Sequence, residues 1–203
     1  MAEIAGAIGL TGGSEPINEE NLIRRCRERD TEAFRWLIEC YQSRIYRYAR
    51  RLLRSNEEAE DVAQEVFLKA FKNISRYDGR ASMSTWLFKI TSNLCIDRIR
   101  RRGRRADLVS LDITNSPVEP SDATWDPQAR AVVADMQTAL ELAIAALSEK
   151  LRPVLLLHDV EGLDYQQIAE VLGIPLGTVK SRLFLARGHL QGALEPYMGN
   201  ATK

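Results

Sequence analysis

Apolar residues recur every three to four positions along most of this chain, the spacing that gathers them on one face of an α-helix. The clearest stripe lies between residues 57 and 73, where Ala59, Val62, Val66 and Phe67 follow this spacing. Further helices are predicted at 18–30, 31–53, 85–105, 131–147, 151–162, 164–172 and 178–190. The pattern therefore predicts an all-α protein.

The helical period disappears between about residue 106 and residue 127. This segment holds Pro117, Pro120 and Pro127, and between 106 and 135 there are six acids against the single base Arg130. Such composition is typical of a linker. We expect two small helical domains, at 19–105 and 131–197, joined by an acidic flexible linker at 106–130, with a flexible lead at 1–18 and a tail at 198–203.

The charge of the chain is balanced as a whole but not along its length. Residues 1–105 carry 21 Lys and Arg against 15 Asp and Glu, a net charge of +6. Residues 106–203 carry 7 against 13, a net charge of −6. A basic half joined to an acidic half favours a polyanionic partner for the first half.

Much of the positive charge lies at the end of the helix predicted at 85–105. Six arginines fall between positions 98 and 105, and arginine at this density attracts phosphate backbones and releases their counterions. Trp86 lies near this basic face, just after a loop at 75–84, an arrangement that suits unstacked bases better than an intact duplex. The alternative is a solvated helix end whose cations complement the helix dipole.

The acidic helix that follows Ser55 carries a second candidate surface, opposite its apolar stripe. Ser55 and Glu58 are predicted to form a capping box at its start. The helix dipole alone explains acids near an N-terminus, but it explains Gln64, Glu65 and the exposed Leu68 less well. A mixed stripe of this kind favours docking onto a basic partner helix, and the alternative is a solvated face.

Two short helices joined by a tight turn form the sharpest local pattern. Asp164 is the predicted N-cap of the first helix, with a glutamine at its third position, Gly173 ends it, and residues 174–177 make the turn. The second helix carries basic side chains and no acid between 178 and 190. This pattern predicts a helix-turn-helix that binds the DNA major groove. The alternative is ordinary packing of two core helices.

Three scattered cysteines, Cys26, Cys40 and Cys95, form no CxxC pair and lie far in sequence from the two histidines. We expect each of them to be a small buried apolar residue in a reducing compartment, not part of a disulfide or zinc site. No phosphate-binding glycine loop or nucleophile-base motif appears. No apolar run approaches the length of a membrane span, and the first residues lack the basic region of a secretory signal. We expect no catalytic activity, metal, cofactor, small-molecule substrate or membrane insertion.

Two motifs of the first half carry a resemblance to a known family. DVAQEVFLKAFKNISRYDG, followed by STWLFKITSNLCIDRIRRRGRR, resembles the promoter-recognition domain of bacterial sigma factors of the extracytoplasmic-function (ECF) group, in the sigma-70 family. The resemblance implies docking of the acidic helix on the clamp helices of core RNA polymerase through Asp61, Gln64, Glu65 and Leu68. It implies recognition and opening of the −10 promoter element through Arg80, Ser82, Ser84, Trp86, Lys89, Asn93, Arg100 and Arg101. For Asn93, a packing role is an equal alternative.

The segment YQQIAEVLGIPLGTVKSRLFLARGHL resembles the domain of the same family that reads the −35 promoter element. The implied DNA-binding residues are Thr178, Lys180, Ser181, Arg182, Phe184 and Arg187. For Arg182 and Arg187, both phosphate contact and pairing within the domain are open. Leu185 departs from the basic residue that many relatives carry in a GTVKSRLxRAR pattern, which removes one expected DNA contact.

The resemblance covers about residues 19–105 and 131–197. It implies an alternative sigma factor, with no enzymatic activity, that binds the clamp helices and flap of core RNA polymerase in the bacterial cytoplasm. Such a factor recognises duplex and single-stranded promoter DNA and directs initiation, and family members are often held inactive by an anti-sigma factor. Two alternatives stay open. One is a dimeric helix-turn-helix regulator of duplex DNA, and the other is an interaction module whose acidic and basic faces pair with proteins.

Overall fold

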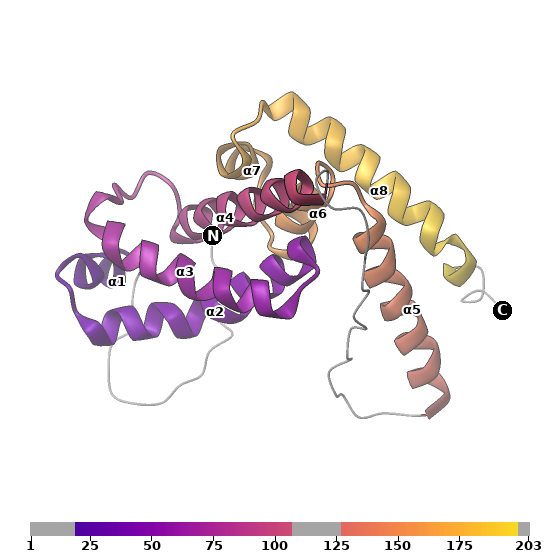
Figure 1. Ribbon diagram of the computed structural model, residues 1–203. Coiled ribbons are helices and arrows are strands. Elements are labelled where there is room, and N and C mark those ends of the chain that lie inside the picture. The colour runs from indigo at the N-terminus through magenta and orange to yellow at the C-terminus, as the bar shows by residue number, and fades with distance from the viewer. Residues whose placement is uncertain (1–18, 107–126, 199–203) are drawn as a thin grey trace.

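The structure is a computed structural model that describes residues 19–106 and 127–198, and within these ranges every regular element is helical (Figure 1). The predicted all-α class is confirmed. The predicted lead, most of the predicted linker and residues 199–203 lie outside the described residues.

Within residues 19–106, the first domain contains α1 (Glu19–Arg27), α2 (Thr31–Leu53), α3 (Asn56–Asn73), the short 3-10 helix η1 (Ile74–Arg76) and α4 (Met83–Ala106). The predicted N-cap of α3 is present, because the Ser55 hydroxyl oxygen accepts a hydrogen bond from the Glu58 backbone N–H at 3.3 Å. The carboxylate of Glu58 instead pairs with Arg102 of α4. The start of α3 is therefore tied to the end of α4.

The helix α4 lies at the centre of the molecule, with α2 and α3 on one side and α7 on the other (Figure 1). Its residues Phe88 and Cys95 are fully buried. Tyr48 of α2 packs edge-on against Phe88 with ring centroids 5.3 Å apart, and its hydroxyl lies 2.8 Å from that of buried Ser92. The central position of α4 means that both domains constrain its side chains.

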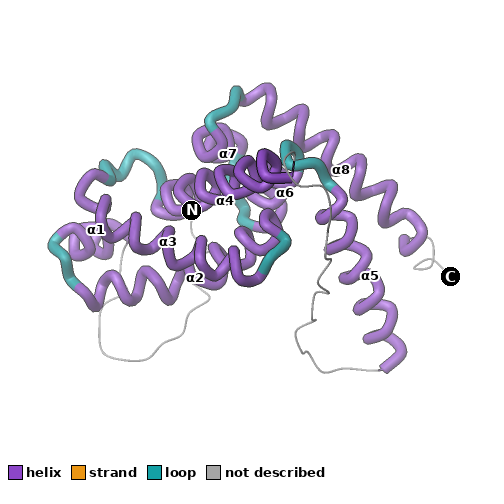
Figure 2. Tube along the Cα trace, viewed as in Figure 1, coloured by secondary structure: helices purple, strands orange, loops and turns teal. Residues whose placement is uncertain are grey.

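Within residues 127–198, the second domain contains α5 (Pro127–Ala146), α6 (Arg152–Leu155), the π-helical turn η2 (Leu156–Val160), α7 (Tyr165–Leu172) and α8 (Leu176–Met198). Leu155, Leu156 and Leu157 are at most 1% exposed, as their apolar run predicts. Figure 2 shows the described loops as short connections at the ends of helices. Because the connections are short, they fix the directions in which α7 and α8 run.

Several boundaries differ from the sequence-based prediction. The helix α5 begins at Pro127, not at Ala131, because a proline at the first helical position lacks an N–H that would have no partner there. The predicted helix at 178–190 is longer at both ends and becomes α8. The predicted loop before α4 is reduced to residues 77–82 because η1 and α4 take its ends.

The two domains pack against each other, chiefly through α4 and α7. Among the described residues, three ion pairs join them: Arg44–Glu161 at 2.9 Å, Arg51–Glu141 at 2.5 Å and Lys89–Glu170 at 3.7 Å. In each pair the base comes from the basic half of the chain and the acid from the acidic half. The charge asymmetry of the sequence therefore appears in the structure as complementarity between the domains.

A buried arginine adds a further link between the domains. Arg152 is 7% exposed, and its guanidinium donates hydrogen bonds to backbone carbonyls of Ile144 (3.0 Å), Ala145 (2.6 Å), Leu147 (2.6 Å) and Leu52 (3.3 Å). These carbonyls lie at or just beyond the C-terminal ends of α5 and α2, where helices leave acceptors without partners. Burial lowers the pKa of Arg152, and the carbonyls compensate for the lost hydration.

Candidate nucleic-acid interface

The residues predicted to contact the −10 element lie along one stripe of α4. Trp86, Lys89, Asn93 and Arg100 are separated by three, four and seven residues, so they share one face over about 21 Å of helix. Trp86 and Lys89 are half-buried, whereas Asn93, Arg100 and the neighbouring Arg101 are exposed. The stripe is thus aromatic at one end and basic at the other.

The indole of Trp86 rests on a second aromatic ring. Its ring centroid lies 5.0 Å from that of Tyr77, with an interplanar angle of 39°. Tyr77 is buried, and its hydroxyl donates a hydrogen bond to the Ala81 carbonyl. Burial raises the pKa of Tyr77 to about 12, so this phenol is neutral. A fixed and partly exposed indole is the kind of platform on which an unpaired base stacks.

The loop before α4 is held by its own hydroxyl groups. The Ser82 Oγ accepts a hydrogen bond from the Thr85 backbone N–H at 3.2 Å and lies 2.9 Å from the Ser84 hydroxyl and 2.8 Å from the Thr85 hydroxyl. Arg80 has a 91% exposed side chain and pairs with Asp78 at 3.3 Å. Ser82 and Ser84 therefore order the start of α4, and Arg80 is the cation that this loop presents to solvent.

Two arginines of the predicted basic block have structural roles. Arg98 pairs with both Asp61 and Glu65 of α3 at 3.5 Å, and Arg102 pairs with Glu58. These contacts hold α4 against α3, so only part of the block is free for nucleic acid. The sequence did not distinguish these arginines from Arg100 and Arg101, because the partners come from a distant part of the chain. The side chains of Arg104 and Arg105 lie outside the described residues.

The predicted docking residues of α3 are accessible. Leu68 is 60% exposed, the side chains of Asp61 and Glu65 are 62% and 40% exposed, and Gln64 is exposed. Beside them, α2 and α3 enclose an open groove of about 480 Å³. Its apolar lining comes from Phe34, Ile38, Ala63, Phe67, Leu68 and Phe71. An acidic edge beside an apolar groove suits a partner helix with basic and apolar faces.

The second domain contains the predicted helix-turn-helix. The Asp164 carboxylate accepts hydrogen bonds from the backbone N–H groups of Gln166 and Gln167 at 2.8 Å, and the Gln167 side chain accepts one from the Asp164 N–H at 2.9 Å. This completes the predicted capping box of α7. Gly173 ends α7 with φ at +63°, a left-handed conformation that glycine adopts without strain.

The exposed face of α8 carries three of the residues predicted to contact the −35 element. Lys180, Ser181 and Phe184 are exposed, and Phe184 reaches 79%. The opposite face is buried through Val179, Leu183 and Ala186. The predicted residues Thr178 and Arg182 are half-buried at the side of the helix. The helix thus presents a small basic, polar and apolar surface to solvent.

Arg187 has a partner within the second domain. Its guanidinium binds both carboxylate oxygens of Asp159, at 3.1 Å through Nε and 2.5 Å through Nη2. Partial burial raises the pKa of Asp159, but hydrogen bonds from Arg187 and His158 oppose this effect, and the net direction is downward. The sequence left two roles open for Arg187, phosphate contact and pairing within the domain. The structure shows pairing within the domain.

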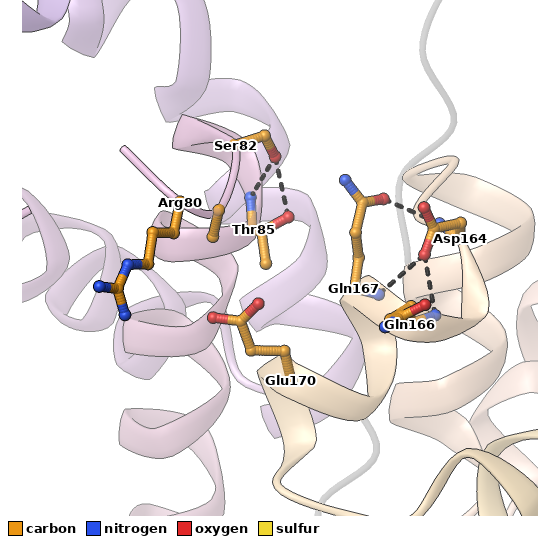
Figure 3. A pocket seen from close by; sticks show the side chains of 8 residues that line it. Arg80, Ser82, Thr85, Asp164, Gln166, Gln167 and Glu170 are labelled. Atoms are coloured by element: carbon orange, nitrogen blue, oxygen red, sulfur yellow. Dashed lines mark hydrogen bonds between the residues drawn. The ribbon is translucent and has the colours of Figure 1, made fainter. Parts of the chain in front are cut away.

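A polar cleft of about 310 Å³ separates the loop before α4 from α7 (Figure 3). One wall is formed by the loop and the start of α4, and the other by Asp164 and α7. The lining residues are Arg80, Ala81, Ser82, Thr85, Asp164, Gln166, Gln167 and Glu170. Sequence reasoning did not place Thr85 or any α7 residue at this site. The opposite net charges of the two halves are the sequence feature that could have indicated such a contact, but they were interpreted as a sign of a polyanionic partner.

A helical domain with a basic, aromatic stripe, joined to a domain with a helix-turn-helix, defines a DNA-binding protein of the transcription machinery. Family models agree, because residues 37–105 match Sigma-70 region 2 and residues 137–190 match Sigma-70, region 4. The chain is 33% identical to the RNA polymerase sigma-H factor of Pseudomonas aeruginosa, over 90% of this chain and 97% of that relative. It is also 33% identical to the ECF RNA polymerase sigma factor SigW of Bacillus subtilis, over 85% and 94%. The chain belongs to the ECF sigma factors, which are initiation factors and not enzymes.

Solved structures share the two-domain helical fold. The sigma factor RpoE of Bartonella quintana, in complex with the anti-sigma factor NepR, matches with a TM-score of 0.68 and 24% identity, over 81% of this chain and 98% of that one. CnrH, in complex with the cytosolic domain of CnrY, matches with a TM-score of 0.63 and 21% identity, over 88% and 97%. Among the described helices, none has the combined length and hydropathy of a membrane span.

Proposed function

We propose that this chain acts as an alternative sigma factor in the bacterial cytoplasm, where RNA polymerase works. It contacts the polymerase, the −10 element and the −35 element through three separate surfaces. The α3 face binds core RNA polymerase, the α4 stripe with its loop binds the −10 element, and α8 binds the −35 element. The observation that carries the proposal is the stripe from Trp86 to Arg100, which offers an aromatic platform and a basic path on one helix face.

The α3 face is suited to a basic, amphipathic helix such as a clamp helix of the polymerase. Leu68 and the apolar groove supply buried area for such a helix. Asp61 and Glu65 supply charge, and a partner cation competes for them with Arg98. Exposed ion pairs are worth about 0–1 kcal/mol, so exchanging one cation for another costs little.

Strand opening follows from preferential binding of unpaired bases. Removing a base from the duplex stack costs a few kcal/mol, and stacking on an aromatic side chain returns about 1–3 kcal/mol per base. Trp86 is fixed on Tyr77 before DNA arrives, so little ordering is needed when a base stacks on it. The duplex offers no exposed base face to this indole, and only the opened strand gains the contact.

For the −35 element, α8 enters the major groove with Lys180, Ser181 and Phe184. Arg182 lies at the edge of this face, within reach of a backbone phosphate. Arg187 supports the domain through Asp159 and orients α8. Region 4 also binds the polymerase flap in this proposal.

An anti-sigma factor is a further proposed partner. Of the two solved structures named above, the sigma factor RpoE of Bartonella quintana is in complex with the anti-sigma factor NepR. In this chain the apolar groove beside Leu68 is the exposed surface that an inhibitor needs to block, because polymerase docking depends on the same face.

The experiment is strand opening by the reconstituted holoenzyme on genomic fragments that it retains, probed with permanganate, which reports unpaired thymines. We expect Trp86→Ala to retain duplex binding but to lose roughly tenfold in thymine reactivity, within the 1–3 kcal/mol of one base stack. Trp86→Phe keeps a ring and should retain most of the reactivity. Trp36→Ala removes an indole of the same domain outside the stripe and is the matched control. Unchanged reactivity with Trp86→Ala contradicts the proposed role.

A further inference from the structure

The exposed face of α8 carries an apolar side chain that the DNA contacts proposed above leave unused. Leu185 is 53% exposed and directly follows Phe184, which is 79% exposed. Among the described residues, these two are the one adjacent pair of exposed large hydrophobic side chains. Single exposed leucines are ordinary on protein surfaces. An adjacent apolar pair on a DNA-binding helix points to an apolar partner instead.

Leu185 lies away from the face that α8 buries in the second domain. The buried face consists of Val179, Leu183 and Ala186, which are at most 2% exposed. The helix packs chiefly on α5, α6 and α7, and it runs along the outside of the second domain (Figure 1). The side chain of Leu185 is therefore accessible in the folded domain.

The neighbours of Leu185 on the helix surface are small. At about 100° per residue, the middle of the exposed face passes through Ser181 and Gly188, with Phe184 on one side and Leu185 on the other. A Cβ atom added to Gly188 would meet nothing within 4 Å. Neither neighbour covers Leu185, so the edge of a base pair can approach this side chain closely.

A leucine side chain distinguishes base pairs in the major groove by one feature. Thymine presents a 5-methyl group there, whereas a G·C pair presents only hydrogen-bond acceptors and a donor. Leucine packs on the methyl group, but it neither donates nor accepts a hydrogen bond. Either base pair loses hydration of its polar edge beneath this side chain, and only the pair with thymine gains an apolar contact in return.

The cations of α8 leave the position of Leu185 to this apolar contact. Guanine is usually read by arginine or lysine. Lys180 lies on the Phe184 side of the exposed face, and Arg187 is held in an ion pair within the domain. Arg182 is half-buried and is the residue proposed above to reach a phosphate. None of these three side chains stands over the base edge beneath Leu185.

We propose that Leu185 is a specificity-determining residue of the −35 contact and selects a thymine through its 5-methyl group. The inference rests on the proposed function for the placement of α8 in the major groove. Leu185 and Phe184 point about 100° apart around the helix axis, so they contact different bases. The two residues together select thymine at two positions of the element.

The experiment begins with selection of the −35 element from random duplexes by the reconstituted holoenzyme. At each selected thymine, the affinity of the holoenzyme is then measured with thymine, uracil, cytosine and 5-methylcytosine, each paired with its complementary base. Thymine differs from uracil, and 5-methylcytosine from cytosine, by the methyl group alone. Both comparisons therefore report a methyl contact without a change in hydrogen bonding.

We expect the wild type to prefer thymine over uracil about fourfold at the Leu185 position, a factor that corresponds to about 0.8 kcal/mol for one methyl group. It should prefer 5-methylcytosine over cytosine by a similar factor. Leu185→Ala should bring both ratios to about one at this position and leave the ratio at the Phe184 position intact. Leu185→Met keeps an apolar side chain and should retain most of the preference.

Two further variants sharpen the test. Leu142→Ala removes a leucine of α5 that is 66% exposed, and this matched control should keep both ratios. Leu185→Arg should replace the thymine preference by a guanine preference of roughly tenfold or more, because arginine donates to both guanine acceptors. A Leu185→Arg variant that keeps the thymine preference overturns the proposal.

Wild-type ratios at every position in Leu185→Ala, or a lost ratio in Leu142→Ala, also overturn the proposal. If Leu185→Ala weakens binding to core RNA polymerase and leaves the base ratios unchanged, the side chain contacts the polymerase and not DNA. A holoenzyme that selects no −35 element contradicts the proposed function together with this inference. A selected element whose methyl ratios do not depend on Leu185 overturns this inference alone, so the two failures are distinguishable.

Discussion

Cys95 lies in the middle of α4 and is fully buried, and this burial raises the pKa of its thiol from 9.0 to about 12. Cys26 shows the same direction, with a pKa of about 11. Both thiols are buried, as predicted from the sequence, whereas Cys40 is only half-buried. At the scale of single residues, burial sets the protonation behaviour of these side chains.

The raised pKa of Cys95 predicts a loss of stability in alkali. Above pH 9.0 the unfolded chain loses this proton, while the folded chain keeps it up to about pH 12, so stability falls as pH rises. Between about pH 8 and about pH 10 the loss is about 1.4 kcal/mol for this thiol. Urea unfolding at both pH values should show a smaller decline for Cys95→Ala than for the wild type. Equal declines in the free energy of unfolding for the two proteins would refute the assignment of the alkaline loss to Cys95.

Phe184 predicts a methyl contact in the −35 element. An exposed phenyl ring on a major-groove helix packs favourably on the 5-methyl group of thymine. Replacing the contacted thymine by uracil should weaken holoenzyme binding about fourfold, since one methyl group is worth about 0.8 kcal/mol. Phe184→Ala should bind more weakly and lose this discrimination. If the wild type tolerates uracil at every position of the element, the contact does not exist.

At the scale of elements, ion pairs join the helices α3 and α4. Arg98 bridges to Asp61 and Glu65, so two acids of the proposed docking face also stabilise the first domain. The carbonyl of Glu58 accepts a further hydrogen bond from Arg98 at 3.2 Å. Replacing both acids by bases would place like charges beside Arg98, so amide substitutions separate docking from folding more cleanly.

We expect Asp61→Asn with Glu65→Gln to weaken binding to core RNA polymerase by roughly tenfold, about 1.4 kcal/mol. The free energy of unfolding should change by less than about 1 kcal/mol, because these ion pairs are exposed. Equilibrium binding of labelled protein to purified core enzyme measures the first effect and urea unfolding the second. Glu60→Gln, an exposed acid of α3 off this face, is the control. Wild-type affinity in the double variant would rule out the α3 docking face.

Local patterns in the sequence identified most elements correctly. Periodicity and caps act over a few residues, so α3 and its Ser55 cap, and α7 with its full capping box, were predictable. The early start of α5 at Pro127 was missed because a proline was taken as part of the linker. The residues of the α4 stripe were predicted from spacing and resemblance, and their DNA contacts remain predictions.

Contacts between distant parts of the chain could not be predicted from such local patterns. Nothing local distinguishes Arg98, which pairs with α3, from Arg100, which is exposed. The pairing of Arg187 with Asp159 joins residues far apart in sequence in the same way. The packing of α7 against α4 depends on the arrangement of whole domains, and the charge asymmetry of the sequence was interpreted as a sign of a polyanionic partner and not of this contact.

At the scale of the whole molecule, Arg152 links the two domains through their helix ends. Arg152→Met should lower the free energy of unfolding by roughly 3 kcal/mol, because buried carbonyls of α5 and α2 lose their donor. Arg152→Lys should recover only part of this loss, since an ammonium group lacks the planar fork that reaches several acceptors. Urea unfolding of the three proteins measures both changes. A methionine variant as stable as the wild type would contradict this role.

The central claim is that the chain confers promoter-specific initiation on RNA polymerase. Run-off transcription with purified core enzyme on a library of genomic fragments, with and without the protein, tests this claim most directly. We predict new, defined start sites that appear only when the protein is present and that share sequences near positions −10 and −35. A specific DNA footprint without polymerase, and no new start sites, would contradict the claim and identify a helix-turn-helix regulator instead.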